Sequence, residues 1–325
     1  MDALLPTVGG YRRHLSRFFF RLLILGWGWF GISSLNAAGT LVVLHSYHSG
    51  YWWTDDQADG IRLVMDQVAP STEPRREFLD LLRHDSPEHR VHLLNLLRVK
   101  YAHESVAVVL TTDEPALRFA VEYRNELFPE AAIVFSGLHG ELPAFLEGQR
   151  KVTGVVETRD PTAALKVIRH FHPRFRRALV IYDSLAPPDE ARFRPDLFGP
   201  ASRDGGVIFT LMAYPEFEAA LGNPAFNPNP EVIFLINSLR NTPVEKSEID
   251  RQVQLIRRYA DVPIYHICSP TLGEGSVGGD LYSGRQQGMA AAALALRILN
   301  GEDPESLPVQ HSHFARFVVD YPEFQ

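Results

Sequence analysis

From Leu41 onward, short apolar runs alternate with amphipathic stretches along the chain. The runs 41–44, 106–110, 132–135 and 152–156 lead into turn residues, as expected for strands of a parallel sheet that is covered on both faces. Between most of them, apolar residues recur at steps of three and four, which is typical of helices. The repeated order of strand, loop and helix predicts parallel βαβ units.

The pattern restarts near Glu157–Asp160, with further strands predicted at 178–182, 207–212, 232–236 and 263–267 and closing strands at 307–309 and 317–319. A chain of 325 residues exceeds the size at which one core usually stops growing. We therefore expect an α/β fold with two doubly wound parallel-sheet lobes.

Capping residues mark the predicted helix starts and one helix end. They are the capping boxes Thr54-x-x-Gln57, Thr242-x-x-Glu245 and Ser283-x-x-Gln286, the caps Ser86 and Asp113, and the C-terminal pair Asn300-Gly301.

The first residues read as an export segment. Four arginines between Arg12 and Arg21 precede an apolar run at 22–35, and the small residues 37–39 follow. This is the arrangement of a secretory signal peptide. Residues 18–38 could instead be retained as a membrane-spanning segment, but Arg21 interrupts that segment. We expect residues 1–38 to be a signal peptide or an N-terminal anchor, and the rest to be exported to the periplasm.

Composition excludes several classes of protein. The formal net charge is −7 and no basic run follows the N-terminal segment, so we expect no nucleic-acid partner. Cys268 is the only cysteine, which rules out an intramolecular disulfide and a cysteine-rich metal site. Neither a nucleophile elbow nor a nucleotide-binding glycine motif is present, so we expect no enzyme activity and no cofactor.

Aromatic and acidic residues gather where predicted strands end, and open α/β sheets bind ligands at that edge. Tyr47, Trp52 and Trp53 are candidate walls for an apolar or planar ligand. The alternative, given equal weight, is that one tryptophan packs beneath the loop as core. Asp113 and Glu157 are candidate acceptors for a ligand donor, although Asp113 is a preferred helix cap and as a cap needs no ligand to explain it.

Other residues at these loops suit the two ends of a zwitterion. Asp183 would join the acceptors for an ammonium or for hydroxyl groups. The backbone N–H groups of Gly137 and Leu138, with Ser46 and Arg240, could hold a carboxylate, which makes an amino acid a possible ligand. The pairs His45/His48 and His311/His313 have spacings that can bind zinc, but no cysteine or glutamate joins either pair at a familiar spacing.

Several segments together resemble a known family: 45–55, 127–129, 133–137, 153–157, Gly278-Gly279, and 295–302 with 307–309. They are similar to ABC-transporter substrate-binding proteins of the type I periplasmic binding fold, in the branch that also serves as sensor domains of histidine kinases and diguanylate cyclases. The resemblance covers the chain from about Leu41, and the order and spacing of the segments carry it.

The resemblance implies two lobes joined by three crossovers, which we place near 157–160, 267–270 and 301–308. The first lobe would hold 39–157 and 270–303, and the second 158–269 and 304–325. It also implies a small-molecule ligand between the lobes and a membrane permease as partner. The alternative is a sensing domain that reports to a sensor kinase or cyclase. The expected ligand-binding residues are Ser46, Tyr47, Trp52, Trp53, Thr112, Asp113, Gly137, Leu138, Glu157, Tyr182, Asp183, Asn237, Arg240 and Gly275.

Overall fold

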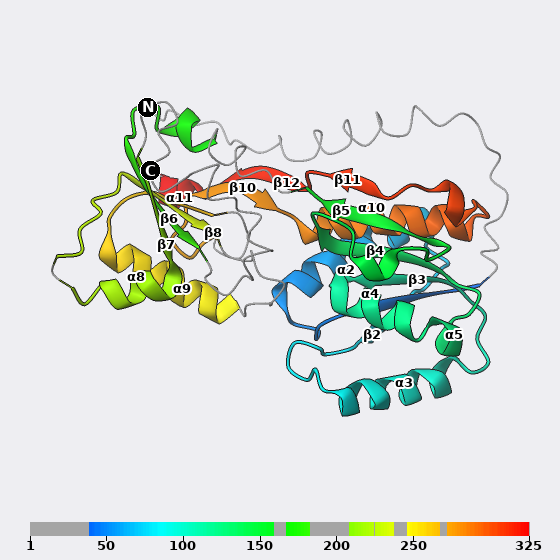
Figure 1. Cartoon of the computed structure of the whole chain (residues 1–325). Helices are drawn as coiled ribbons and strands as arrows, with labels where there is room; N and C mark the ends of the chain where they lie inside the picture. The colour runs from blue at the N-terminus through cyan, green and yellow to red at the C-terminus, as the bar shows by residue number, and fades with distance from the viewer. Residues whose placement is uncertain are drawn as a thin grey trace, which may run out of the picture. The chain divides into compact units, whose positions relative to one another are not determined.

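Two six-stranded sheets organise the chain (Figure 1). The computed structural model describes residues 39–158, 167–182, 208–223, 225–236, 246–266 and 272–324. The first sheet has the order β11-β5-β4-β3-β1-β2 and the second has the order β12-β10-β9-β8-β6-β7. All neighbouring strands are parallel except β10 and β12. This confirms the predicted fold class of two parallel-sheet α/β lobes.

The first sheet comprises β1 (Thr40–His45), β2 (Arg75–Phe78), β3 (Val106–Thr112), β4 (Ala132–His139), β5 (Val152–Glu157) and β11 (Gln310–Ser312). Around it in the chain are α2 (Trp52–Val68), α3 (Pro87–Tyr101), α4 (Asp113–Glu122), α5 (Arg124–Leu127), η1 (Ala144–Leu146), α10 (Gly284–Leu299) and η3 (Pro304–Ser306). The second sheet comprises β6 (Arg177–Tyr182), β7 (Ile208–Ala213), β8 (Val232–Ile236), β9 (Ile264–His266), β10 (Gly278–Tyr282) and β12 (Ala315–Val319), with α8 (Tyr214–Ala220), α9 (Lys246–Tyr259) and α11 (Tyr321–Phe324).

Two of the expected crossovers lie elsewhere. β10 pairs with β9 and β12 in the second sheet, whereas α10, which follows it, packs on the first sheet. The chain therefore crosses near Ser283 and not at 267–270. β11 pairs with β5 in the first sheet and β12 with β10 in the second, so the next crossing is at 313–314 and not at 301–308. Short strands this close to a crossing carry no signal of which sheet they join.

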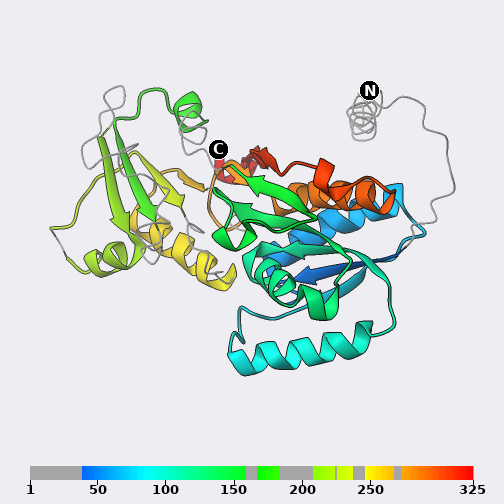
Figure 2. The ribbon, with the colours of Figure 1, turned by 45° about the vertical axis from the view of Figure 1, so that its right-hand side comes forward.

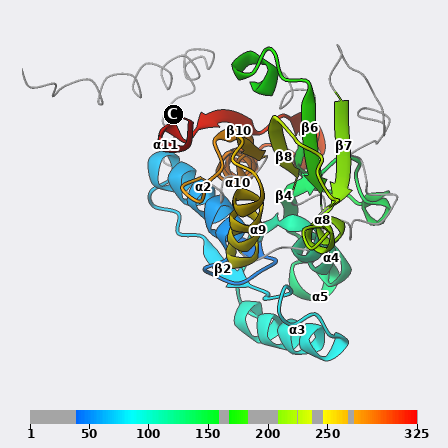
Figure 3. The same cartoon turned by 90° about the vertical axis from the view of Figure 1, so that its left-hand side faces the viewer.

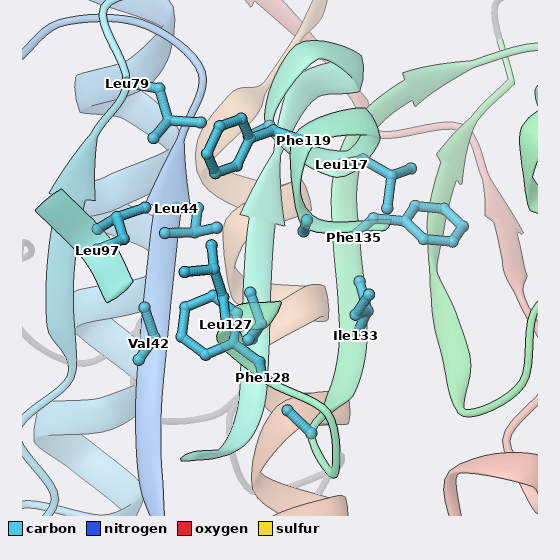
Figure 4. Packing of buried hydrophobic residues seen from close by; sticks show 14 of the residues in the cluster. Val42, Leu44, Leu79, Leu97, Leu117, Phe119, Leu127, Phe128, Ile133 and Phe135 are labelled. Carbon is cyan, nitrogen blue, oxygen red and sulfur yellow. The ribbon is translucent and has the colours of Figure 1, made fainter. Parts of the chain in front are cut away.

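One face of the first sheet packs against α3, α4 and α5. Figure 4 shows Leu44 and Ile133 of the sheet among Leu97, Phe119 and other side chains from these helices and loops. Phe119 and Phe135 are fully buried, and burial of one such side chain contributes roughly 1.5–3 kcal/mol. This core anchors the strands whose carboxyl ends form the site described below.

The other face of the first sheet is covered by α2 and α10, which lie side by side (Figure 2, blue and orange). Two glycines permit this close approach. A Cβ on Gly60 would lie 2.0 Å from the carbonyl oxygen of Arg285, and one on Gly288 would lie 2.2 Å from that of Gln57. The helix N-termini are thereby held together at one edge of the sheet.

In the second lobe, β8, β6 and β7 lie side by side (Figure 3). Helices α8 and α9 bury Phe217, Val253 and Ile256 against Leu179 and Ile233 of the sheet. The opposite face is covered by another cluster that includes Phe175, Phe234 and Tyr265.

Helix capping follows the sequence only in part. Ser86 caps α3 by accepting a hydrogen bond from the His89 N–H, and Ser283 accepts one from the Gln286 N–H. The capping box at Thr54 and Gln57 is wrong, since α2 begins at Trp52 and its N-cap, Tyr51, makes no side-chain cap bond. The box at Thr242 lies outside the described residues.

Two strand predictions also need correction, and one edge strand was not predicted. β4 continues beyond the predicted strand 132–135 to His139, with a register shift between Phe135 and Leu138 where it pairs with β5. The closing strand is β11 at Gln310–Ser312 and not 307–309. β2, which has the sequence RREF, had no apolar run to reveal it and forms an edge of the first sheet, where charged side chains are tolerated. Within the described ranges, no helix has the length and apolarity needed to cross a membrane.

Candidate functional site

Buried polar side chains collect at the carboxyl ends of neighbouring strands in the first sheet. His45 ends β1, Thr112 ends β3 and Glu157 ends β5, and each is at most 1 % exposed. Ser136, in β4 between them, is also fully buried. Parallel strands bring these ends to one edge, which is where open α/β sheets hold ligands. The expected location of the site is therefore rich in buried hydrogen-bonding groups.

Asp113 is the centre of this polar group. Its backbone has φ +67°, in the left-handed region that aspartate tolerates better than most residues. One carboxylate oxygen accepts a hydrogen bond from Trp53 Nε1 at 2.9 Å, and the other accepts one from Gln57 Nε2 at 3.0 Å. Asp113 is the first residue of α4, and the cap position belongs to Thr112. The capping explanation is therefore wrong, because the carboxylate binds α2.

Burial raises the pKa of Asp113 to about 7, against the opposing effect of the hydrogen bonds from Trp53 and Gln57, and the nearby Glu157 raises it further. A carboxyl group with this pKa changes charge near neutral pH. The same desolvation strengthens its hydrogen bonds, because few water molecules compete for the oxygens. Asp113 therefore holds the indole of Trp53 in a fixed orientation.

Gln57 joins α2 to β4 as well. Its side-chain oxygen accepts a hydrogen bond from Ser136 Oγ at 2.7 Å, while its nitrogen donates to Asp113. The residue occupies the buried stripe of α2 that also contains Ile61 and Met65. A glutamine in step with the apolar residues Ile61 and Met65 was the sequence signal for this role, although the spacing from Thr54 had favoured a capping box instead.

Gln287 is the corresponding residue of α10. Its side-chain oxygen accepts the backbone N–H of Gly137 at 2.9 Å, and its nitrogen donates to the carboxylate of Glu157. Gly137 has φ +78°, and a Cβ there would lie 2.2 Å from Asp113 Oδ1. The two glutamines thus tie α2 and α10 to the same edge of the sheet. Gln287 also lies on a buried helical stripe, with Ala291 and Ala295.

Two of the groups expected to hold a carboxylate, the Gly137 N–H and the Ser46 hydroxyl, are already hydrogen-bonded within the protein. The N–H of Gly137 donates to Gln287, and Leu138 is a buried β4 residue in register with Val156 of β5. Ser46 Oγ donates to the Thr112 carbonyl at 2.6 Å and accepts the Ala116 N–H at 2.8 Å. These contacts join the end of β1 to β3 and α4, so Ser46 has a structural role in the first lobe.

The aromatic loop after β1 divides into buried and partly exposed rings. Tyr47 is 6 % exposed and lies edge-on to Tyr51, with ring centroids 5.4 Å apart. Trp52 and Trp53 are both half-buried, with ring centroids 5.5 Å apart. Trp52 packs against the apolar cluster of the second lobe that contains Tyr282. The tryptophans thus lie between the polar group of the first lobe and side chains of the second.

The structure places two of the expected second-lobe residues. Tyr182 ends β6 and packs against the same apolar cluster as Trp52. Gly275 has φ +110° and lies beside the Arg257 side chain of α9. Asp183, Asn237 and Arg240 lie outside the described residues.

Three of the four histidines in these pairs contact protein groups. His45 Nδ1 lies 3.1 Å from Thr112 Oγ1, and burial, with a smaller effect from Arg76, lowers the pKa of His45 to about 4. His48 contacts the carbonyl of Ser49. His311 is exposed, and His313 contacts Asp280. In the part of the chain that the structure describes, no group of three histidine, cysteine or acidic side chains could hold a metal ion.

A separate concavity of about 520 Å³ is lined by residues 172–175 and Glu231. These residues precede β6 and β8, so they mark the amino edge of the second sheet, opposite to the edge at which the strands end. It therefore has no part in the polar group described above.

No protein-family model and no curated protein matches the chain. Solved structures do match it. An ABC domain from Streptococcus pneumoniae in complex with L-Trp has a TM-score of 0.60 at 14 % identity, covering 88 % of this chain and 92 % of its own. A ligand-free, open substrate-binding protein with adhesive properties from Clostridium difficile has a TM-score of 0.59 at 12 % identity, covering 86 % and 92 %.

A third matching structure is that of a sugar-binding protein. GanP, a glucose-galactose binding protein from Geobacillus stearothermophilus, has a TM-score of 0.55 at 11 % identity, covering 87 % of this chain and 98 % of its own. A LacI transcriptional regulator from Lactobacillus brevis also matches, and at these identities the likeness concerns the fold. The chain has the two-lobe α/β architecture of the type I periplasmic binding proteins.

Proposed function

We propose that this protein is a non-catalytic, exported solute-binding protein that closes two lobes on a small molecule and delivers it to an ABC transporter. The observation that carries the proposal is the position of the adjacent tryptophans. Trp53 is fixed by the buried Asp113 of the first lobe, and Trp52 packs on the apolar cluster of the second. A ligand beside these rings would contact both lobes.

Contact with both lobes is what closure requires. A ligand shifts an equilibrium between open and closed forms only as far as it binds the closed form more tightly. Half-buried aromatic rings supply large contact areas with little loss of side-chain freedom. Tyr182, at the carboxyl end of β6, adds a second-lobe aromatic to the same cluster. These features favour closure around a flat or apolar ligand part.

The ligand class that fits best is amino-acid-like or aromatic. The carboxylates of Asp113 and Glu157 lie at the edge where the strands end, and Gln57 and Gln287 hold them there. Each carboxylate oxygen can accept a second hydrogen bond beside the one from the protein, so this edge favours a ligand with a donor group such as an ammonium. The S. pneumoniae protein of similar fold was solved with L-Trp, which is an amino acid with an aromatic side chain. Asp183, Asn237 and Arg240 would supply polar contacts from the second lobe.

Tryptophan fluorescence offers a direct test. The chain has four tryptophans, and only Trp52 and Trp53 follow residue 36. A protein that begins at Ala37, the start of the second compact unit, therefore reports on these two rings alone. We expect one or more of the amino acids to change its emission and to raise its melting temperature. A ligand at a hundred times its dissociation constant adds about 2.7 kcal/mol of stability.

A matched pair of variants locates the site. Trp53→Phe removes a hydrogen bond to a carboxylate at the proposed site, and Tyr101→Phe removes the hydrogen bond to Glu77 at 2.7 Å elsewhere in the first lobe. We expect Trp53→Phe to weaken ligand binding at least tenfold and Tyr101→Phe to leave it unchanged. Equal affinities in both variants would show that the Trp53 indole does not form part of the site, and turnover of the ligand would contradict a purely binding function.

A further inference from the structure

The three connections between the sheets are hydrogen-bonded to one another. The N–H of Thr158, which follows β5, donates to the Ser312 carbonyl at the end of β11 at 2.9 Å. The N–H of Ser283, between β10 and α10, donates to the Phe314 carbonyl at 2.8 Å. The segment 312–314 therefore lies between the other two connections and binds both.

His313 adds side-chain bonds at this point. Its Nδ1 lies 3.0 Å from the Thr158 carbonyl oxygen, and its Nε2 lies 2.7 Å from Asp280 Oδ2 of β10. The ring also lies edge-on to Tyr282, with centroids 5.7 Å apart. Both oxygen partners are acceptors, so each contact is a hydrogen bond when the ring nitrogen carries a proton, and the imidazolium form makes both bonds at once. The bond to the Asp280 carboxylate is then charge-assisted, which strengthens it.

The neighbours of His313 show that the chain changes lobe here. Phe314 is buried in the apolar cluster of the first lobe, whereas Ala315 packs against a cluster of the second. Lobe rotation in such a fold is absorbed by changes of φ and ψ in a few connecting residues. Such changes at 312–314 would move His313 relative to Thr158 or Asp280 and stretch one of its two hydrogen bonds.

We infer that His313 is a positioning residue for ligand capture: its hydrogen bonds to Thr158 and Asp280, which we call the hinge contact, restrict the lobes of the unliganded protein to a narrow range of orientations. The link to ligand capture rests on the function proposed above. A protein that occupies the binding-competent arrangement for only a fraction of the time has its apparent affinity reduced by that fraction. Loss of the hinge contact should therefore broaden the lobe orientations and weaken binding.

The orientation can be measured without ligand. Spin labels at Val99→Cys on α3 and Gln254→Cys on α9, both exposed, report the distance between the lobes, with Cys268→Ser removing the natural thiol. Pulsed electron paramagnetic resonance should give a narrow distance distribution for this labelled protein. We expect His313→Ala to make it at least about twice as broad, because fewer conformations are excluded. His311→Ala, an exposed histidine two residues away, is the matched control and should leave it unchanged.

Asp280→Asn provides a second test if His313→Ala fails to fold, since it weakens the hinge contact and leaves His313 in place. It should broaden the distribution as well. An unchanged distribution in the folded variants overturns the inference, whether or not the protein binds any solute. In the same variants the dissociation constant for L-tryptophan should rise about tenfold, as expected if the competent fraction falls to about a tenth. Broader distances with unchanged affinity would refute the role in ligand capture.

Discussion

Asp113→Asn should change how the stability of the protein depends on pH. The carboxyl group of Asp113 has an ordinary pKa of 3.8 and, through burial, a pKa of about 7 in the folded protein. The folded state therefore holds the proton more tightly than the unfolded chain does. The free energy of unfolding should fall as the pH rises from about 4 to about 7 and then level off. The total decrease in the free energy of unfolding is about 4 kcal/mol, of which about 2.5 kcal/mol falls between pH 5 and pH 8.

Asparagine removes the titration and keeps the shape. Rotation of the Gln57 amide would let it accept from the new amide and donate to Ser136, so we expect the variant to fold. His45 acts with the opposite sign. The pKa of His45 in the folded protein, about 4, is below the ordinary 6.5. Its stabilising contribution to the free energy of unfolding is therefore complete above pH 6.5 and is lost as the pH falls toward 4. Because both proteins contain His45, its effect cancels in their difference.

The measurement is urea unfolding of both proteins, followed by circular dichroism at pH 5, 6, 7 and 8. As the pH rises from 5 to 8, the free energy of unfolding of the natural protein should fall by about 2.5 kcal/mol relative to that of the variant. Two parallel curves would refute the reasoning, because they would show that Asp113 ionises in the folded protein as readily as in the unfolded chain.

Three further predictions concern stability. Trp53→Phe should cost about 1–3 kcal/mol in urea unfolding at pH 8, since it removes a hydrogen bond to buried Asp113, and a loss below about 0.5 kcal/mol would contradict that bond. Gly137→Ala should lower the melting temperature more than Gly148→Ala. Both glycines have positive φ and share a backbone cost of about 1 kcal/mol, but a Cβ meets Asp113 Oδ1 at 2.2 Å only in the first. Ser86→Ala should cost about 1 kcal/mol, because α3 loses its cap, and glycine in the same position should restore most of it.

Local patterns were sufficient where a feature depends on neighbours in sequence. Val106–Thr112 is a strand because its apolar run suits a sheet covered on both faces, and Ser86 caps α3 because the cap bond spans only three residues. The carboxyl edge of the first sheet followed from the order of strands and helices alone. The hydrogen-bond partners of the polar side chains at that edge could not be predicted from this order. Gln57 and Asp113 are 56 residues apart, and no pattern along the chain records such a contact.

By itself the sequence determined the α/β class, the two parallel sheets and the aromatic loop after the first strand, because periodicity and turn chemistry act over a few residues. Only the tertiary structure decided that Asp113 binds Trp53 and Gln57, and that the chain changes sheet at Ser283 and at 313–314. The physical reason is that strand partners and buried hydrogen bonds join distant segments. Their free energy depends on which surfaces meet in the folded protein, and a buried donor or acceptor must find its partner there.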